Sequence, residues 1–133
     1  MNKLDQFLVR PQLTTNFHID EFACKDGTAV PWNLVQNAQL HADNLQVIRD
    51  YVGQPLHINS GYRNPTYNNL KSDASESYHT KALATDLRAE SITPKELFKV
   101  IQMLIEMKKI REGGLSIYPS FVHYDSRGFK ARW

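Results

Sequence analysis

Two short segments that lie far apart in the chain constrain its fold most strongly. Residues 77–86, SYHTKALATD, carry His79 and Asp86 seven positions apart, and residues 121–125, FVHYD, supply His123. Two neutral imidazoles and one carboxylate would fill three corners of a tetrahedral zinc site and leave the fourth corner for water, which is what separates a catalytic zinc from a structural one. A fold that uses this pattern has to bring the two segments side by side.

The size and composition of the chain predict one domain over residues 1–133. A chain of 133 residues with 41% hydrophobic content suits one core that buries roughly two thirds of the unfolded surface. Lys and Arg are scattered among acids and the net charge is +2, so nothing indicates a nucleic acid partner. Cys24 is the only cysteine, which excludes an internal disulfide, and we expect it to be a small buried side chain.

The sequence also predicts a chain that does not insert into a membrane. No segment approaches the ~20 apolar residues that span a bilayer, and the N-terminus lacks the apolar centre of a signal peptide. We therefore expect a protein that is made in the cytoplasm without its own export signal, and we favour a monomer.

Apolar periodicity and turn residues predict an α+β domain whose sheet is small and largely antiparallel, with helices packed on it. Residues 1–19 are expected to be an extended lead-in, followed by a short helix that Asp20 caps. The further expected elements are a helix over 32–52 ended by Gly53, a strand over 56–59, a short helix over 67–70, a loop over 71–77, a strand over 83–89, a helix from Pro94 to about Ile110 and a hairpin with strands 115–118 and 121–125. The tail over 126–133 is basic and aromatic.

This arrangement can bring the three candidate metal ligands together. Asp86 is expected on a strand, His79 in the loop before it, and His123 on a hairpin strand that can pair beside the strand of Asp86. Each half of the pattern is weak by itself, because a histidine and an aspartate at this spacing occur often by chance. The other histidines are interpreted as structural: His41 as a partly exposed residue of the long helix, and His57 as a half-exposed strand residue.

Four motifs, taken in order, resemble a known family. Residues 77–86 are similar to the S-x-H-x-x-G-x-A-x-D signature of the zinc D-alanyl-D-alanine carboxypeptidases, and residues 60–63, SGYR, are similar to a turn of the same family. Residues 114–125, GLSIYPSFVHYD, and residues 22–27, FACKDG, resemble the closing hairpin and the N-terminal region of a small subgroup. The resemblance extends over about residues 17–133.

The resemblance implies a hedgehog/D-Ala-D-Ala peptidase-like fold, shared with phage L-alanyl-D-glutamate endopeptidases and hedgehog signalling domains. It implies Zn²⁺ held by His79, Asp86 and His123, and hydrolysis of a peptide bond in a bacterial peptidoglycan stem peptide by zinc-activated water. Arg63 would then meet the carbonyl or carboxylate of the substrate, although a surface arginine paired with an acid is the alternative. Ser77 is a candidate for binding the substrate or for supporting a ligand. The implied place of action is the cell wall, with a phage or prophage enzyme as one possibility.

Two positions depart from the family pattern. Ala82 stands where a glycine is usual, and alanine is costly there if the position needs a positive φ. Ser120 stands three residues before His123, where many relatives carry an acidic general base. Asp125 is the replacement candidate for the base, while a salt bridge with Arg127 or support of the ligand His123 is its alternative role.

These departures leave rival interpretations open. The first is an active zinc carboxypeptidase or endopeptidase, and the second is a non-catalytic zinc domain that binds a cell-wall peptide or a protein partner. A third, a structural module without metal, requires the match of the three ligands to be accidental.

Overall fold

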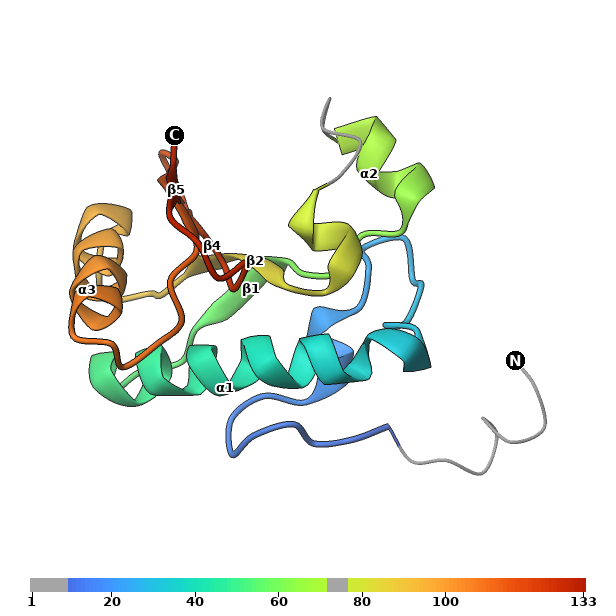
Figure 1. The fold of residues 1–133 in the computed structure, drawn as a ribbon, viewed down its shortest axis with the longest axis horizontal. Coiled ribbons are helices and arrows are strands. Elements are labelled where there is room, and N and C mark those ends of the chain that lie inside the picture. The colour runs from blue at the N-terminus through green and yellow to red at the C-terminus, as the bar shows by residue number, and fades with distance from the viewer. Residues whose placement is uncertain (1–9, 72–76) are drawn as a thin grey trace.

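A five-stranded sheet lies at the centre of the molecule in the computed structural model, which describes residues 10–71 and 77–133. The sheet has the order β1-β2-β4-β3-β5; β3 and β5 are parallel and the other neighbours are antiparallel. The elements are η1 (Ile19–Phe22), η2 (Trp32–Leu34), α1 (Val35–Val52), β1 (His57–Ser60), α2 (Pro65–Lys71), η3 (Tyr78–Lys81), β2 (Ala84–Arg88), α3 (Pro94–Glu106), β3 (Gly114–Ile117), β4 (Val122–Asp125) and β5 (Ala131–Arg132). The predicted α+β class with a largely antiparallel sheet is confirmed (Figure 1).

Side-chain alternation along the central strands gives the sheet two different faces. In the pairing of β2 with β4, Thr85 is opposite Tyr124 and Asp86 is opposite His123. Thr85 and Tyr124 both contact His41 of α1. Because successive side chains of a strand point to opposite faces, Asp86 and His123 lie on the face that α1 does not cover.

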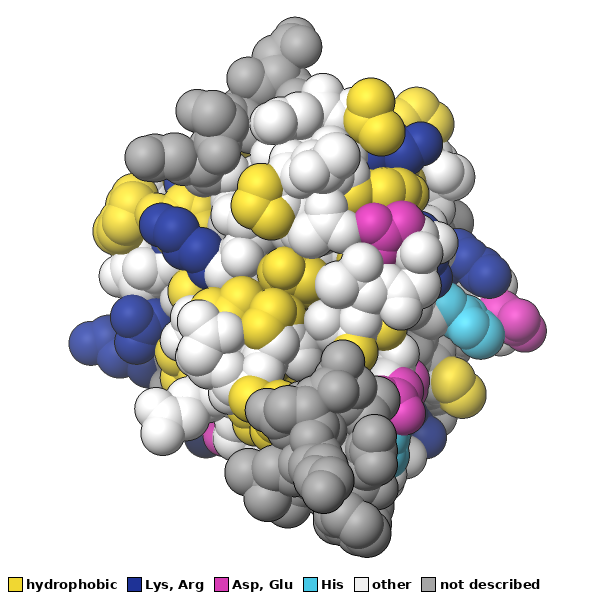
Figure 2. Space-filling model, turned by 90° about the vertical axis from the view of Figure 1, so that its right-hand side faces the viewer, with side chains coloured by type: hydrophobic (Ala, Val, Ile, Leu, Met, Phe, Trp, Pro, Cys, Tyr) yellow, Lys and Arg dark blue, Asp and Glu magenta, His cyan; other side chains and the backbone are white. Residues whose placement is uncertain are grey.

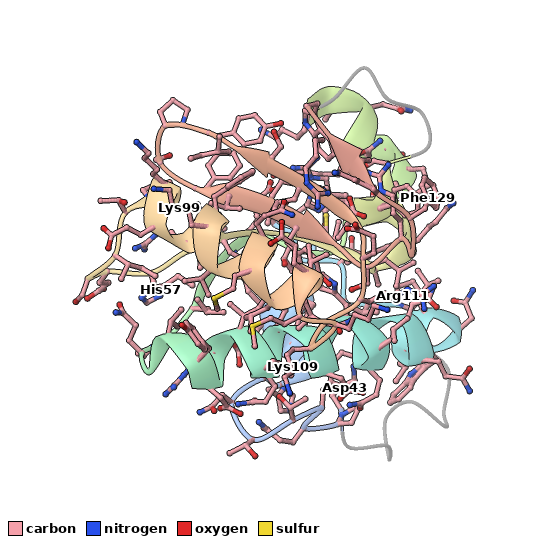
Figure 3. All side chains as sticks on the ribbon, turned by 60° about the vertical axis from the view of Figure 1, so that its left-hand side comes forward. Asp43, His57, Lys99, Lys109, Arg111 and Phe129 are labelled. Carbon is pink, nitrogen blue, oxygen red and sulfur yellow. The ribbon has the colours of Figure 1, made fainter. Side chains whose placement is uncertain are left out.

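The core lies between the helices and the covered face of the sheet. α1 buries one stripe and α3 buries another, and both meet apolar side chains of the strands (Figure 3). The residues of this layer are Ala38, Ala42, Leu45 and Ile48 of α1, Leu97, Ile101, Leu104 and Ile105 of α3, and Leu87, Leu115 and Val122 of the sheet. Each fully buried Leu, Ile or Val stabilises the fold by about 1.5–3 kcal/mol, so this layer fixes the strands that carry the polar face.

The ends of the two long helices differ in part from the prediction. α1 ends as predicted at Gly53, which has a left-handed φ of 70° and donates its N–H to the carbonyl of Arg49. The start of the predicted helix is instead the separate 3₁₀ turn η2, a common tightening at helix ends. α3 ends at Glu106 rather than near residue 110, because Lys108 adopts a φ of 59°. Met107, the residue after the last turn of α3, is 55% exposed.

The cap of η1 and the start of the first strand were also predicted wrongly. His18, not Asp20, caps η1: its Nδ1 accepts the backbone N–H of Asp20 at 3.0 Å. Sequence rules favour Ser, Thr, Asp and Asn as caps, so a histidine acceptor was not foreseen. β1 begins one residue later than predicted, at His57.

His41 is fully buried, which contradicts the prediction of a partly exposed residue. Its Nδ1 lies 2.7 Å from Oγ of Ser126, and its Nε2 lies 2.9 Å from Oγ1 of Thr85. Asn44 also reaches the hydroxyl of Ser126, at 3.1 Å. The polar partners that make burial possible come from distant parts of the chain and are invisible in the helix pattern.

The tail after β4 forms a strand that the sequence did not predict. β5 pairs in parallel with β3, with Gly114 opposite Ala131. Arg111, in the loop before β3, donates from Nε to the carbonyl of Ser126 at 2.9 Å and ties the start of the tail to the sheet (Figure 3).

One face of the molecule shows no single dominant charge. On the face seen in Figure 2, basic side chains lie at separate places, with acidic groups and small hydrophobic groups between them. None of the helices within residues 10–71 and 77–133 is long and apolar enough to cross a membrane. The predicted loop over 71–77 lies almost wholly outside the described residues.

Candidate metal centre

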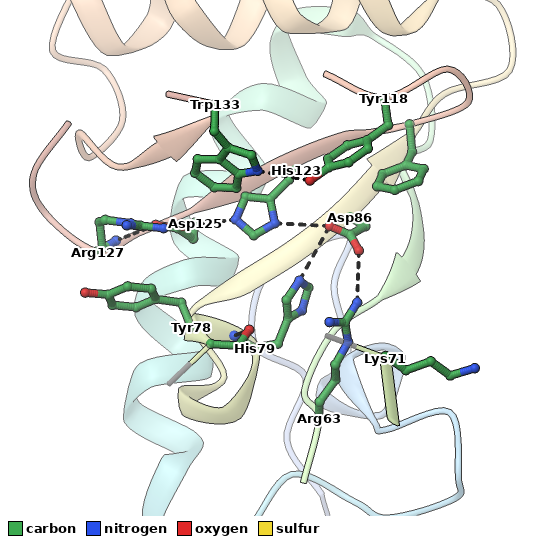
Figure 4. Close-up of a pocket in the computed structure, with 12 residues that line it drawn as sticks. Arg63, Lys71, Tyr78, His79, Asp86, Tyr118, His123, Asp125, Arg127 and Trp133 are labelled. Carbon is green, nitrogen blue, oxygen red and sulfur yellow. Dashed lines mark hydrogen bonds and ion pairs between the residues drawn. The ribbon is translucent and has the colours of Figure 1, made fainter. Parts of the chain in front are cut away.

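His79, Asp86 and His123 converge on one point of the uncovered face of the sheet (Figure 4). Oδ1 of Asp86 lies 3.5 Å from Nε2 of His79 and 3.1 Å from Nδ1 of His123. One ligand atom of each residue lies within 4.8 Å of the other two. All three side chains are buried, so the fold holds two imidazoles and a carboxylate against one another.

The turn η3 fixes the orientation of His79. The backbone N–H of His79 donates to Oγ of Ser77 at 3.2 Å, and Nδ1 of the His79 ring lies 2.7 Å from the carbonyl oxygen of Gly61. Because a carbonyl only accepts, Nδ1 carries the proton and the lone pair of Nε2 points to the centre. A buried acceptor behind a histidine is the usual support of a metal ligand.

Asp125 fixes the orientation of His123 in the same way. Nε2 of His123 lies 2.7 Å from Oδ2 of Asp125, so Nε2 carries the proton and Nδ1 is left for the centre. Asp125 also accepts bonds of 2.8 Å from Nε and from Nη2 of Arg127, and one of 2.9 Å from the N–H of Gly114. Burial by itself would raise the pKa of Asp125, but the bonds from Arg127 and His123 outweigh it and hold the pKa well below its usual range.

The charge of Asp86 is stabilised by its neighbours. Burial would raise the pKa of this carboxyl, but the hydrogen bonds that His123 and His79 donate when their inner nitrogens also carry a proton hold it well below its usual range. For His123, burial lowers the pKa, while the bonds to Asp125 and Asp86 raise it, with a net rise above the usual value. The centre thus consists of two imidazole rings around an ionised carboxylate.

This donor set fits zinc. Two imidazole nitrogens and one carboxylate oxygen are the ligands of a catalytic zinc site with an open position. Bonds of about 2.0–2.1 Å in a tetrahedron place ligand atoms roughly 3.3 Å apart, and the two measured separations from Asp86 are 3.5 and 3.1 Å. Both histidines have their outer nitrogens hydrogen-bonded, which leaves the inner nitrogens for the ion.

Arg63 lies beside the three ligands. Its Nη2 is 3.3 Å from Oδ2 of Asp86, its Nε donates to Oγ of Ser60 at 3.0 Å, and its backbone N–H donates to the carbonyl of His79 at 3.0 Å. Arg63 thus pairs with an acid, as in the alternative considered for it, and it also lines the cleft over the centre; its contact with a substrate stays a prediction. Ser77 also lines the cleft, and its contact with His79 favours the role of supporting a ligand.

The structure shows the conformation of Ala82 and the location of Ser120, the two residues that depart from the family pattern. Ala82 has φ 57° and ψ 32°, the left-handed conformation that explains why glycine is usual there, and its N–H bonds the carbonyl of His79 at 3.3 Å. Ser120 is exposed in the hairpin loop and does not line the cleft. Among the described residues, the carboxylates that line the cleft are Asp86 and Asp125. Since both oxygens of Asp125 are hydrogen-bonded, its contacts favour support of His123 over the role of general base.

The cleft above the centre has a volume of about 500 Å³ and is open to solvent. Its walls include Tyr78 of η3, and also three aromatic side chains that motif reasoning missed because they come from the hairpin loop and the tail: Tyr118, Phe121 and Trp133. The aromatic composition of residues 118–121 and of the tail was the only sequence feature that pointed to them. The cleft is thus lined in part by aromatic rings and opens above the three candidate ligands.

The fold and the three converging ligands define a metallopeptidase type of domain. The chain matches the protein family described as Peptidase M15 over residues 15–125, and it therefore belongs to that family of zinc-dependent peptidases. The resemblance seen in the sequence motifs is confirmed by this match. A search of curated proteins found no match to the chain.

Proposed function

We propose that the protein is a zinc peptidase that hydrolyses a peptide bond in the stem peptide of bacterial peptidoglycan. The observation that carries the proposal is the convergence of His79, Asp86 and His123 at the floor of an open cleft, in a chain of the peptidase M15 family. His79, Asp86 and His123 hold the ion, and the outer bonds of the two imidazoles keep the lone pairs of both rings directed at it.

The chain supplies binding, orientation and charge for the reaction. A zinc ion bound here supplies a water whose pKa is lowered to about 7. Arg63 presents its guanidinium to the same cleft, where it can hold the carbonyl oxygen of the substrate as negative charge develops on it. Removal of one such donor typically slows a reaction by about a hundredfold or more.

The charges of the cleft favour an anionic peptide. Among the described residues that line the cleft, the cationic side chains Arg63, Lys71 and Arg127 outnumber the carboxylates Asp86 and Asp125, which pair with Arg63 and Arg127, so the wall carries an excess of positive charge. A stem peptide carries free carboxylates, so its charge complements this wall. The protein would act at the cell wall.

Digestion of purified peptidoglycan and of synthetic stem peptides tests the proposal. Mass spectrometry of the products identifies the bond that is cut, and thus separates carboxypeptidase from endopeptidase activity. We expect turnover that chelation and His123→Ala both abolish, while Ser120→Ala, an exposed hairpin residue, leaves it unchanged. Turnover that survives in His123→Ala would refute the proposal.

The second candidate is a non-catalytic zinc domain that binds a cell-wall peptide. Ser120 in place of an acid, together with the engagement of both carboxylates in the described part of the cleft, favours it. Saturable binding of stem peptides by the zinc-loaded protein, without any cleavage over hours, would establish this alternative.

A further inference from the structure

One side of the cleft is an aromatic wall, which we define as Tyr118, Phe121 and Trp133. Trp133 follows β5, and the other two residues belong to the hairpin loop between β3 and β4. Figure 4 shows Trp133 and Tyr118 on one side of the metal centre, with Arg63 and Lys71 on the opposite side. The cleft therefore has an aromatic side, where the guanidinium of Arg127 also lies 5.5 Å from the ring of Trp133, and a side formed by Arg63 and Lys71, with the three ligands between them.

The aromatic wall is held in place by specific bonds. The buried hydroxyl of Ser116 on β3 donates to the carbonyl oxygen of Trp133 at 2.7 Å. The indole N–H of Trp133 donates to the hydroxyl of Tyr118 at 3.0 Å, and the ring of Tyr118 stacks on Phe121 at 4.6 Å with an interplanar angle of 13°. Two polar anchors and a stacked pair make the wall a rigid surface rather than a loose end of the chain.

Core packing does not account for the exposed faces of these rings. Trp133 is 57% exposed and Tyr118 is 37% exposed, although both line the cleft. Large apolar rings that stay exposed beside a cleft mark binding surfaces. The indole N–H is already used by Tyr118, so what Trp133 offers to a ligand is the apolar face of its ring.

The position of Trp133 relative to the metal centre identifies what it would touch. Its ring centroid lies 4.9 Å from that of the ligand His123. An extended peptide advances about 3.3 Å per residue, so a substrate with its scissile bond at the metal places the adjacent residue over Trp133.

From this geometry we infer that Trp133, anchored by Tyr118 and Ser116, is a substrate-binding residue for the amino acid next to the scissile bond on the His123 side. The inference rests on the proposed function. The ring face suits the peptide plane and a short aliphatic side chain, whereas charged groups of the substrate face Arg63 and Lys71 on the other side.

Tryptophan fluorescence gives a test that does not depend on turnover. The chain has two tryptophans, so Trp32→Phe leaves Trp133 as the only one, and Trp133→Phe leaves Trp32 as the matched control. The probe is a stem peptide with a reduced, uncleavable bond, titrated into the zinc-loaded protein. We expect a saturable change of emission in Trp32→Phe and none in Trp133→Phe; no change in Trp32→Phe, or an equal change in both, would overturn the inference.

Kinetics give the second test. We expect Trp133→Ala to raise KM about tenfold, the equivalent of about 1.4 kcal/mol of lost binding, with kcat changed less than about threefold. Trp133→Phe should retain most of the affinity, and Tyr118→Phe, which removes only the partner of the indole N–H, should raise KM a few-fold. If Trp133→Ala does not fold by circular dichroism, these two variants decide the matter.

The outcomes separate this inference from the proposed function. Unchanged KM in all folded variants would overturn the role of Trp133 while turnover itself upholds the peptidase. A higher KM on glycan-linked peptides alone would overturn the peptide contact in favour of a sugar contact. If the wild type cleaves nothing, the peptidase proposal fails, and the fluorescence titration still decides whether Trp133 meets the peptide.

Discussion

At the scale of single residues, the contacts of Asp125 determine its chemistry. Its carboxylate is fully buried and accepts bonds from Arg127, Gly114 and His123, so its charge is stabilised and its oxygens are in use. A general base needs an oxygen that is free to receive a proton from the attacking water. The carboxylate instead holds the ring of His123 with Nδ1 directed at the metal centre.

Asp125→Asn should therefore weaken metal binding more than it slows the chemistry. The loss of a partner behind a ligating histidine typically costs 10–100-fold in metal affinity, and we expect a zinc dissociation constant raised by about that factor. At saturating zinc, kcat should fall by clearly less than the ~100-fold or more that a general base contributes. Competition with a chromophoric chelator measures the affinity, and Asp43→Asn, an exposed carboxylate of α1, is the control. Unchanged affinity with a hundredfold slower reaction would contradict the support role.

The burial of His41 leads us to predict that the free energy of unfolding depends on pH. Burial holds its pKa at about 3, below the usual 6.5; Asp125 counteracts part of this effect, while His123 and His79 add to it. Above pH 6.5 the ring is neutral in both the folded and the unfolded chain. As the pH falls from 6.5 towards 3, only the unfolded chain binds the proton, and the folded state loses about 1.4 kcal/mol per pH unit.

Urea unfolding at several pH values checks this dependence against His41→Gln. The variant should be less stable at pH 7, but its disadvantage should shrink by about 2 kcal/mol at pH 5, because it has no proton to bind at this position. The difference between the two proteins reports the contribution of His41. Parallel curves over this range would show that His41 is not kept neutral by its burial.

At the scale of elements, the site is made by alternate positions of paired strands. Asp86 and His123 are direct partners on β2 and β4, and Ser116 is the partner of His123 on β3. The strands of Asp86 and His123, and their adjacency, could be predicted because turn residues and apolar alternation mark them locally. The role of Gly114 could not be predicted, because it depends on where the side chain of Asp125 lies in space.

Gly114→Ala should disturb the metal centre, although Gly114 lies on β3 and not on a strand that supplies a ligand. A Cβ at this position would collide with the carboxylate of Asp125 and with Nη2 of Arg127. We expect a loss of about 1–3 kcal/mol in the free energy of unfolding, as for overpacked sites, together with weaker zinc binding. Gly53→Ala, at the end of α1 with open space around it, should cost about 1 kcal/mol and leave zinc affinity unchanged. Equal zinc affinity in the two variants would show that Asp125 can move without harm.

At the scale of the whole molecule, α1 and α3 cover one face of the sheet, and the metal centre and its cleft lie on the other face, together with η3 and the end of α2 (Figure 1). This plan, and the meeting of His79, Asp86 and His123, could be anticipated from ordered motifs and strand alternation. The contribution of the tail could not be, since β5 and Trp133 depend on pairing with β3 and on the hydroxyl of Ser116. The buried network around His41 was missed for the same reason, because its partners lie more than 40 positions away along the chain.

The zinc content of protein purified without chelator tests the central claim most directly. The wild type is compared with His79→Ala and with the control His57→Ala, a half-exposed histidine of β1 that is paired with Glu90 outside the cleft. We predict about one zinc per chain in the wild type and in the control, and less than ~0.1 in His79→Ala. A wild type below ~0.3 zinc per chain, or a His79→Ala variant that keeps its full zinc content, would contradict a metal centre at His79, Asp86 and His123.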